Sequence, residues 1–344
     1  LLKSKMIKWF LFLFFYSFGF AYNASDCRKE NNPSWFCNYM HEHNKVYDPS
    51  NVEFHKSKLQ SINTHVDKHG VHWGLTSRSD KNYKDTNYAL KIEKHLYLQR
   101  SKNEKHIHLG APSGLPPIDW RNNKGISYVT SVKDQGNCGG CFAFASAAIL
   151  EFWSRKNGQP KSLSVQAIMD CTSGYKRPDD GCDGGLMEYV FEYAKNRPIP
   201  LETEVPWQEK DRKCPRKLWS YVEVKDYKVL MHSENNKAES EIEWLLHTYG
   251  PVSVGIDSTT MDNYRDGIFR AHMCTTDIDH AVTIVGYTKD AWVIKNSWGP
   301  FWGQNGYLYL ERGKNACGVA EYIVYVTNAK PIHEKEYTKW SFST

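Results

Sequence analysis

The sequence lacks the long apolar run, the internal repeats and the large net charge that would each indicate a particular class of protein. No stretch reaches the roughly 20 apolar residues needed to span a bilayer. A net charge of +5 is too small to indicate nucleic-acid binding by itself. With 40% hydrophobic and 24% charged residues, the composition is that of a globular protein, which excludes wholesale disorder or a collagen-like chain.

Metal-binding patterns are also missing. The one Cys-x-x-Cys pattern joins Cys138 and Cys141, and neither a second such pair nor a pair of histidines lies at zinc spacing. We therefore expect no metal and no cofactor.

The charge that is present is unevenly distributed. Residues 1–21 contain three lysines and no acidic residue, and residues 22–115 contain 14 basic and 10 acidic residues. Residues 116–344 contain 27 basic and 29 acidic residues, so this larger part of the chain is mildly acidic.

The N-terminus has the pattern of a secretory signal peptide. Three lysines precede an apolar run at 9–20, with Gly19 and Ala21 in the small-residue positions of a cleavage site after Ala21. A membrane anchor is the alternative, but the run is too short to cross a bilayer. We expect a protein of the secretory pathway, lysosomal or extracellular, in which disulfides are permitted. Asn23 begins the one N-glycosylation sequon, which is as compatible with use as with an unused tripeptide.

Residues 22–115 differ from the rest of the chain in composition. Apolar residues at helical spacing predict an amphipathic helix from about Val52 to Lys68, and no strand pattern is strong. A Pro/Gly/Ser cluster at 111–117 predicts an extended, protease-accessible boundary.

Beyond that boundary the chain divides into a helical half and a β half. The apolar segment Cys141–Lys156 predicts a buried helix that ends at Asn157-Gly158, and a second helix is expected at about Leu186–Lys195. After residue 222, short β-branched and aromatic runs separated by turns favour an antiparallel sheet or small barrel; they lie at 221–229, 252–256, 281–286, 292–295, 307–311 and 322–326. A cleft between two such halves is a preferred place for a site.

Cys141 is the strongest candidate nucleophile. Glycines on both sides of Cys138 predict a tight turn that delivers Cys141 to the start of the buried helix, where the helix dipole favours a thiolate. A redox or zinc function for the Cys138–Cys141 pair is the alternative. The absence of further metal ligands at the right spacing, and an adjacent Gln135, favour acyl transfer.

His280 and Asn296 complete a catalytic pattern. His280 heads an apolar strand and Asn296 ends the next one, followed by Trp298 and Trp302. Each has a plain structural interpretation when taken alone. Together they fit an imidazole that Asn296 orients and an indole shields, with its second nitrogen directed at Cys141.

With these motifs the chain resembles the papain-family cysteine proteases, in the cathepsin L-like branch. The resemblance covers residues 116–328 and, more weakly, the segment before them. It implies an α+β fold of two subdomains, one helical and one an antiparallel β-barrel-like half, with the active site in the cleft between them. It also implies a signal peptide at 1–21, an inhibitory propeptide at 22–115, a peptidase domain at 116–330 and a tail of unknown role at 331–344.

The resemblance assigns roles to four residues. Cys141 is expected to be the nucleophile, His280 the general acid and base, and Asn296 the residue that orients His280. Gln135 and the Cys141 backbone amide are expected to form the oxyanion hole. Gly140 stands where Ser or Ala is usual in the family, and Phe142 where Trp or Tyr is usual; we expect activity to survive both changes.

The remaining cysteines suit a disulfide framework. Setting Cys141 aside, six cysteines follow residue 116 and allow fifteen pairings. The resemblance implies the pairs Cys138–Cys182, Cys171–Cys214 and Cys274–Cys317. Cys27 and Cys37 are either a further bridge or two free thiols.

The resemblance also outlines a substrate cleft. Gly184 and Gly185 match a glycine wall along which a substrate backbone lies extended. Apolar residues would line the pocket for the second residue upstream of the cut, which predicts a hydrophobic side chain there; the substrate-binding set is Gly184, Gly185, Met187, Gly255, Ile278, Ala281, Trp298 and Tyr322. We hypothesise that Tyr322 shortens this pocket and favours Leu or Val over Phe. The alternative is that Tyr322 turns into the core.

The function predicted from the sequence is that of a secretory zymogen of a cysteine endopeptidase. No histidine pair of the cathepsin B kind follows Gly185, which disfavours a dipeptidase. Expected partners are polypeptide substrates, the chain's own propeptide and cystatin-type inhibitors, with no nucleic acid, no membrane span and a monomeric state. The rival interpretation is a catalytically weak relative that serves as a binding protein.

Histidines suggest how the propeptide responds to acid. Residues 22–115 hold nine of the 14 histidines, whose ordinary pKa is about 6.5. We hypothesise that their protonation loosens the segment and permits autocleavage near 114–117; the set is His41, His43, His55, His65, His69, His72, His95, His106 and His108. The alternative is that surface histidines are simply common there.

Overall fold

The computed structural model describes residues 21–81, 114–173, 181–197, 199–215, 217–218, 221–231, 238–332 and 340–341. Three predicted segments lie outside the described residues: residues 1–20 of the expected signal peptide at 1–21, the lysine-rich stretch with His95, His106 and His108, and most of the expected tail. The chain forms two compact units, Leu1–Ser61 and Ile62–Thr344.

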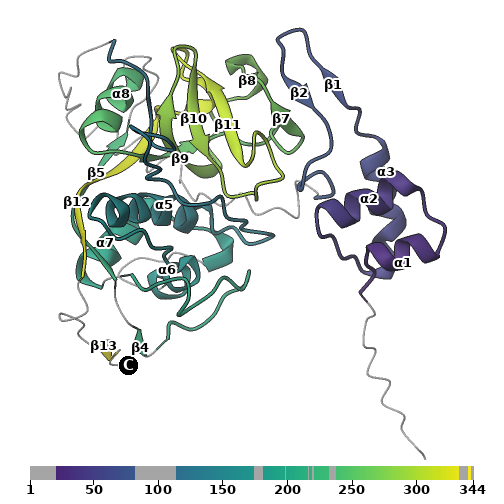
Figure 1. Cartoon of the computed structure of the whole chain (residues 1–344), viewed down its shortest axis with the longest axis horizontal. Helices are drawn as coiled ribbons and strands as arrows, with labels where there is room; N and C mark the ends of the chain where they lie inside the picture. Colours follow the sequence, from purple (N-terminus) through teal and green to yellow (C-terminus); the bar gives the residue numbers. More distant parts are fainter. Residues whose placement is uncertain are drawn as a thin grey trace, which may run out of the picture. The chain divides into compact units, whose positions relative to one another are not determined.

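The described part of the first unit consists of short helices (Figure 1). They are α1 (Ala24–Lys29), α2 (Ser34–Glu42), the 3-10 turn η1 (Pro49–Asn51) and α3 (Val52–Gln60). The Asn23 side chain caps α1 by accepting from the backbone amides of Ser25 and Asp26. A Cys27–Cys37 disulfide joins α1 to α2.

The expected helix from Val52 to Lys68 is wrong in its C-terminal half. Helix α3 ends at Gln60, and Ser61 is its C-cap. The β-branched residues at 62, 64 and 66 favour extended backbone over a helix. Strand β1 (His65–Val66) instead pairs with β2 (His72–Trp73), and β2 pairs with β7 (Tyr264–Asp266), a sheet that the sequence did not indicate.

The helical half of the second unit is built on α5 (Cys141–Lys156), which has the bounds expected from the sequence. Twelve of its sixteen residues are buried, because α6 (Val165–Thr172), α7 (Met187–Asn196) and the sheet surround it. Helix α7 agrees with the second expected helix to within one residue. Helix α6 was not foreseen, although its N-cap Ser164 accepts from the backbone amide of Ala167 as a capping residue should.

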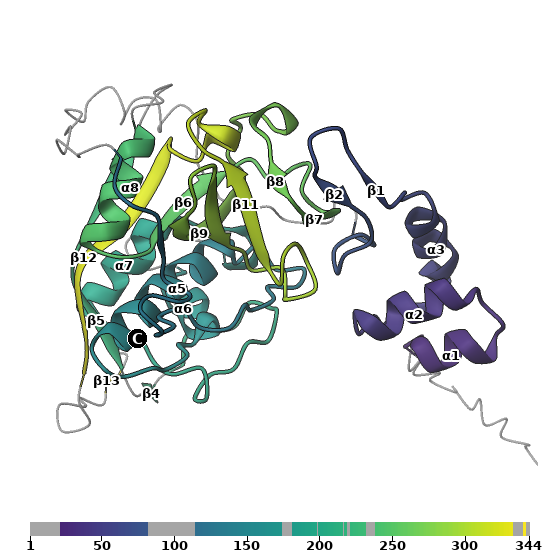
Figure 2. The ribbon, with the colours of Figure 1, turned by 45° about the horizontal axis from the view of Figure 1, so that its top comes forward.

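The β half is an eight-stranded sheet in the order β5-β12-β6-β9-β10-β11-β8, with β3 paired to β9. Figure 2 shows most of these strands from a second side. The pairing is antiparallel except for β11 with β8. The strands are β3 (Ile118–Asp119), β5 (Val222–Met231), β6 (Val252–Ile256), β8 (Ile268–Phe269), β9 (His280–Tyr287), β10 (Ala291–Lys295), β11 (Tyr307–Glu311) and β12 (Tyr322–Pro331).

The remaining elements are short or lie on the outside of this sheet. Helix α8 (Ala238–Thr248) packs its buried leucines against β6 and β9, and η2 (Gly181–Asp183), η3 (Ala271–Met273) and η4 (Ala316–Gly318) are single turns. Part of the expected tail pairs β13 (Trp340–Ser341) with β4 (Lys217–Leu218). No helix among the described residues is long and apolar enough to cross a membrane.

Two hydrophobic cores lie on opposite faces of the sheet. One unites α5, α6 and α7 with Ala281, Tyr322 and Val324. The other unites α8 with residues such as Val282, Ile323 and the buried tryptophans of the β half. The two-subdomain α+β architecture expected from the sequence is therefore present, and Cys141 and His280 lie where its halves meet.

Candidate active site

Cys141 is the first residue of α5 and is fully buried. It is a free cysteine, whereas the other eight cysteines form disulfides. The partial positive charge at the N-terminus of a sixteen-residue helix favours the thiolate over the thiol. Gly140 is the N-cap, and a Cβ at this position would lie 3.3 Å from the Trp207 ring, so a larger residue there would press on that indole.

The loop before Cys141 is fixed by contacts within the helical half. The Cys138–Cys182 disulfide and a bond from the Gly139 amide to the Cys182 carbonyl, 2.8 Å long, attach it to η2. Gly184 follows at once, with a φ of +112° that only glycine adopts without strain. The glycine pair at 184–185 is thereby held beside the candidate nucleophile.

His280 and Asn296 lie together as the sequence predicted. His280 begins β9, Asn296 follows β10, and the His280 Nε2 to Asn296 Oδ1 distance is 2.8 Å. The Trp298 indole stacks on the imidazole with 4.8 Å between ring centroids and shields that hydrogen bond from water. Because Asn296 takes Nε2, Nδ1 is the nitrogen that remains for acid–base chemistry.

The titration of His280 is strongly displaced. Complete burial lowers the pKa of His280 to about 3, the hydrogen bond with Asn296 raises it, and the positive charge of Arg78 lowers it further. Burial in this state therefore favours the neutral imidazole.

Gln135 is oriented by two hydrogen bonds. Its Oε1 accepts from the Ser297 hydroxyl at 2.6 Å, and its Nε2 donates one hydrogen to the Cys138 carbonyl at 2.8 Å. An amide nitrogen carries two hydrogens, so a second can be donated to an oxyanion. The backbone amide of Gln135 also donates to the Ser297 carbonyl, which ties this residue to the segment that carries Asn296.

A buried charged cluster lies behind the site and joins the two halves. Glu151 of α5 receives hydrogen bonds from Lys133, Thr130 and the Leu163 amide, and Lys295, next to Asn296, donates to Thr130. Burial lowers the pKa of Lys295 to about 8, while Glu151 raises it and Lys133 lowers it. Sequence reasoning did not identify this cluster, since its members are far apart along the chain.

The expected substrate pocket is more closed than the sequence suggested. Met187, Ala281 and Tyr322 are buried, Gly255 lies opposite Ala281 in the β6–β9 register, and Ile278 is partly buried. The Tyr322 hydroxyl donates to Glu188 on the first turn of α7. The Tyr322 ring is buried in the same cluster as Met187 and Ala281, and Glu188 was not among the residues predicted.

The disulfides in the structure are Cys138–Cys182, Cys171–Cys214 and Cys274–Cys317, the pairs that the resemblance implied, together with Cys27–Cys37. Asn23 is exposed and uses its side-chain oxygen in the cap of α1.

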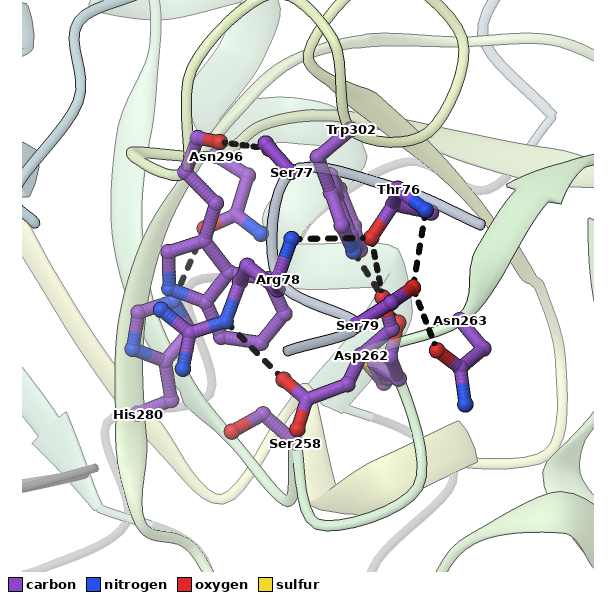
Figure 3. Close-up of polar contacts among 12 residues, drawn as sticks. Thr76, Ser77, Arg78, Ser79, Ser258, Asp262, Asn263, His280, Asn296 and Trp302 are labelled. Carbon is purple, nitrogen blue, oxygen red and sulfur yellow. Dashed lines mark hydrogen bonds and ion pairs between the residues drawn. The ribbon is translucent and has the colours of Figure 1, made fainter. Parts of the chain in front are cut away.

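A segment that precedes the peptidase part occupies the neighbourhood of the site (Figure 3). Thr76 donates to the Asp262 carbonyl at 2.6 Å, Ser77 to the Trp298 carbonyl at 3.0 Å, and Arg78 to the Asp262 carboxylate at 2.9 Å. Nothing in the sequence could have indicated these pairs, because their members lie about two hundred residues apart.

Comparison with known proteins identifies the family. The profile of the papain family cysteine proteases matches residues 116–327. The chain is 37% identical to cathepsin 7 of Mus musculus over 239 residues, 65% of this chain and 69% of that protein. It is 36% identical to a cathepsin L-like protein of Caenorhabditis elegans over 215 residues, 59% of this chain and 61% of that protein.

Comparison with solved structures supports the same family. Digestive procathepsin L 3 from the larval midgut of Tenebrio molitor matches with a TM-score of 0.69 and 25% identity, covering 86% of this chain and 98% of that one. The chain belongs to the papain family of cysteine proteases. Within that family it is a cysteine-type endopeptidase of the cathepsin L-like branch, in its zymogen form.

Proposed function

We propose that Cys141, His280, Asn296 and Gln135 form the catalytic machinery of this endopeptidase. The observation that carries the proposal is the 2.8 Å contact between His280 and Asn296 beneath Trp298, at the junction where Cys141 begins α5. The orientation of Gln135 by Ser297 supports the oxyanion-hole role.

The reaction follows from these positions. Cys141 transfers its thiol proton to His280 Nδ1, which forms a thiolate and an imidazolium. The thiolate attacks the carbonyl carbon of the scissile peptide bond, and the displaced electron pair forms an oxyanion. Gln135 Nε2 and the Cys141 backbone amide donate to that oxyanion. The carbon–nitrogen bond then breaks, and His280 Nδ1 gives its proton to the leaving amine, which leaves a thioester.

Hydrolysis regenerates the enzyme. His280 takes a proton from water, the resulting hydroxide attacks the thioester carbonyl, and the carbon–sulfur bond breaks to release the acid and the Cys141 thiolate. Asn296 acts through His280 by fixing which ring nitrogen faces the sulfur.

The segment around 76–80 supports autoinhibition by the propeptide. Its hydrogen bonds to Asp262 and Trp298 lie beside His280, so a substrate has to displace it. The acid stage of the cycle also needs an imidazolium, which the neighbouring Arg78 charge disfavours.

The substrates we propose are polypeptides with a hydrophobic residue at the second position upstream of the cut. The apolar set of Met187, Gly255, Ile278 and Ala281 supports this preference. We propose further that the enzyme is a monomer of the secretory pathway, lysosomal or extracellular, and that cystatin-type proteins inhibit it.

Acid incubation of the purified chain tests the catalytic proposal. The expected result is a fall in size together with turnover of a peptidyl-coumarin amide, and Cys141→Ser should abolish both. Labelling by a thiol-directed epoxide should require Cys141. A chain that is processed and folded but neither cleaves nor takes the label would instead be the binding protein considered as the alternative.

A further inference from the structure

The contacts made by the Arg78 side chain are those of a side chain bound in a recognition site. Its Nε lies 2.9 Å from Asp262 Oδ1 (Figure 3), and the centre of its guanidinium lies 4.0 Å above the Trp298 ring. The Arg78 side chain is only 4% exposed. An ion pair combined with stacking on an indole is the geometry that a planar guanidinium prefers and an ammonium cannot reproduce.

The residues that receive Arg78 are rigidly placed. Trp298 is buried between His280 and Trp302, with 4.9 Å between the two indole centroids. The Trp302 indole nitrogen donates to the Met261 carbonyl at 3.0 Å, which fixes the backbone next to Asp262. The residues that form the pocket thus all belong to the peptidase part.

We propose that Asp262 and Trp298 form a binding site for an arginine side chain of polypeptide substrates, which Arg78 occupies in the zymogen. This inference deepens the proposed function and rests on it. Once the pro-segment has left, Asp262 remains as a carboxylate beside an aromatic face, and a substrate guanidinium restores both contacts.

The catalytic geometry assigns this site to one side of the scissile bond. His280 protonates the leaving amine, so the residues downstream of the cut lie on the side of the imidazole. Trp298 stacks on that imidazole. We therefore expect the arginine at one of the first positions after the cleaved bond, while an acidic residue there is repelled by Asp262.

Internally quenched peptides test the site directly. One series keeps a constant upstream sequence and places Arg, Lys, Ala or Glu at each of the first three downstream positions. At one position the activated enzyme should prefer Arg to Ala by about tenfold in kcat/KM, consistent with one charge-assisted contact, with Lys between them and Glu poorest. In Asp262→Asn the Arg-to-Ala ratio should fall to about 2 or less.

A matched control removes a nearby negative charge instead. Asp266→Asn, four residues away on β7 and half-exposed, should keep the wild-type ratio. Equal ratios in wild type and Asp262→Asn, or a wild-type enzyme that does not favour Arg, would overturn the proposal.

Two further measurements separate this inference from the catalytic proposal. A coumarin amide has no residue downstream of the cut, so its turnover reports catalysis alone. No turnover overturns both proposals, whereas turnover without a preference for Arg overturns only this one.

Inhibition by the peptide 71–81 gives a second readout. Arg78→Ala in that peptide should weaken inhibition of the wild type about tenfold and of Asp262→Asn hardly at all; equal weakening would contradict recognition by Asp262.

Discussion

Asp279, the neighbour of His280, is a carboxyl group in an unfavourable environment for its charge. Burial raises the pKa of Asp279 to about 7, the hydrogen bonds from Ser258 lower it, and the charge of Asp257 raises it again. A folded-state pKa above the unfolded value of 3.8 means that the folded protein binds the proton more tightly. Stability from this residue is complete below pH 3.8 and is lost as the pH rises toward 7.

Asp279→Asn should therefore increase the stability of the folded protein at neutral pH. The amide oxygen still accepts from Ser258 and carries no charge, so the variant should gain about 2–4 kcal/mol over the wild type at pH 8 and nothing comparable at pH 4. Urea unfolding of the Cys141→Ser protein at both pH values measures this, with exposed Asp290→Asn as the control. A gain of the same size at both pH values would contradict the titration argument.

Tyr322 carries the specificity prediction at this scale. If its ring limits the depth of the pocket, the wild type should cleave peptides with Leu or Val at the second upstream position faster than those with Phe. Tyr322→Ala should reverse the order, while Tyr322→Phe, which loses the bond to Glu188 and keeps the ring, should keep it. A peptide library in which the wild type prefers Phe to Leu would refute the hypothesis.

Among elements, the β1–β2 hairpin joins the pro-segment to the peptidase part. Asp67 organises its turn by accepting from the amides of His69 and Val71 and from the Trp73 indole. Two histidines of the hairpin meet the peptidase part differently. His69 faces His272 with 4.5 Å between ring centroids, and His72 Nδ1 lies 4.0 Å from the Asp266 carboxylate.

These contacts sharpen the hypothesis of histidine-driven activation. Two protonated imidazoles repel each other, whereas a protonated His72 attracts Asp266. His69→Gln should lower the pH at which the zymogen activates, and His72→Gln should raise it. Processing followed over pH 4–7 measures both shifts. Activation at the wild-type pH in both variants would mean that hairpin protonation does not control release.

The sequence predicted those elements whose formation depends on residues that are close together in the chain. The segment 141–156 is apolar on all faces and ends at Asn157-Gly158, so its bounds were readable. Cys141, His280 and Asn296 could be identified from the sequence because each lies in a recognisable local motif. The hairpin and Arg78 were missed because their stability comes from partners about two hundred residues away, and short strands such as His65–Val66 carry little periodicity.

At the scale of the whole molecule, the Glu151 cluster connects the two halves through buried charge. Glu151→Gln leaves Lys133 and Lys295 without their shared carboxylate and should cost about 3–5 kcal/mol of unfolding free energy. Glu202→Gln removes a partly exposed partner of Lys133 and should cost clearly less. Denaturant unfolding of the Cys141→Ser chain compares the losses of unfolding free energy in the two variants. Equal losses would show that the buried Glu151 cluster does not connect the two halves.

The position of strand β12 between the two cores determines how the enzyme tolerates substitutions. Its residues alternate between the cores: Tyr322, Val324 and Val326 face the helical half, and Ile323 and Tyr325 face the other. One strand therefore serves as the common wall of both halves, and neither half can loosen without disturbing the other. A substitution that repacks one face of β12 should therefore also be felt in the core on its other face, because close-packed interiors transmit strain.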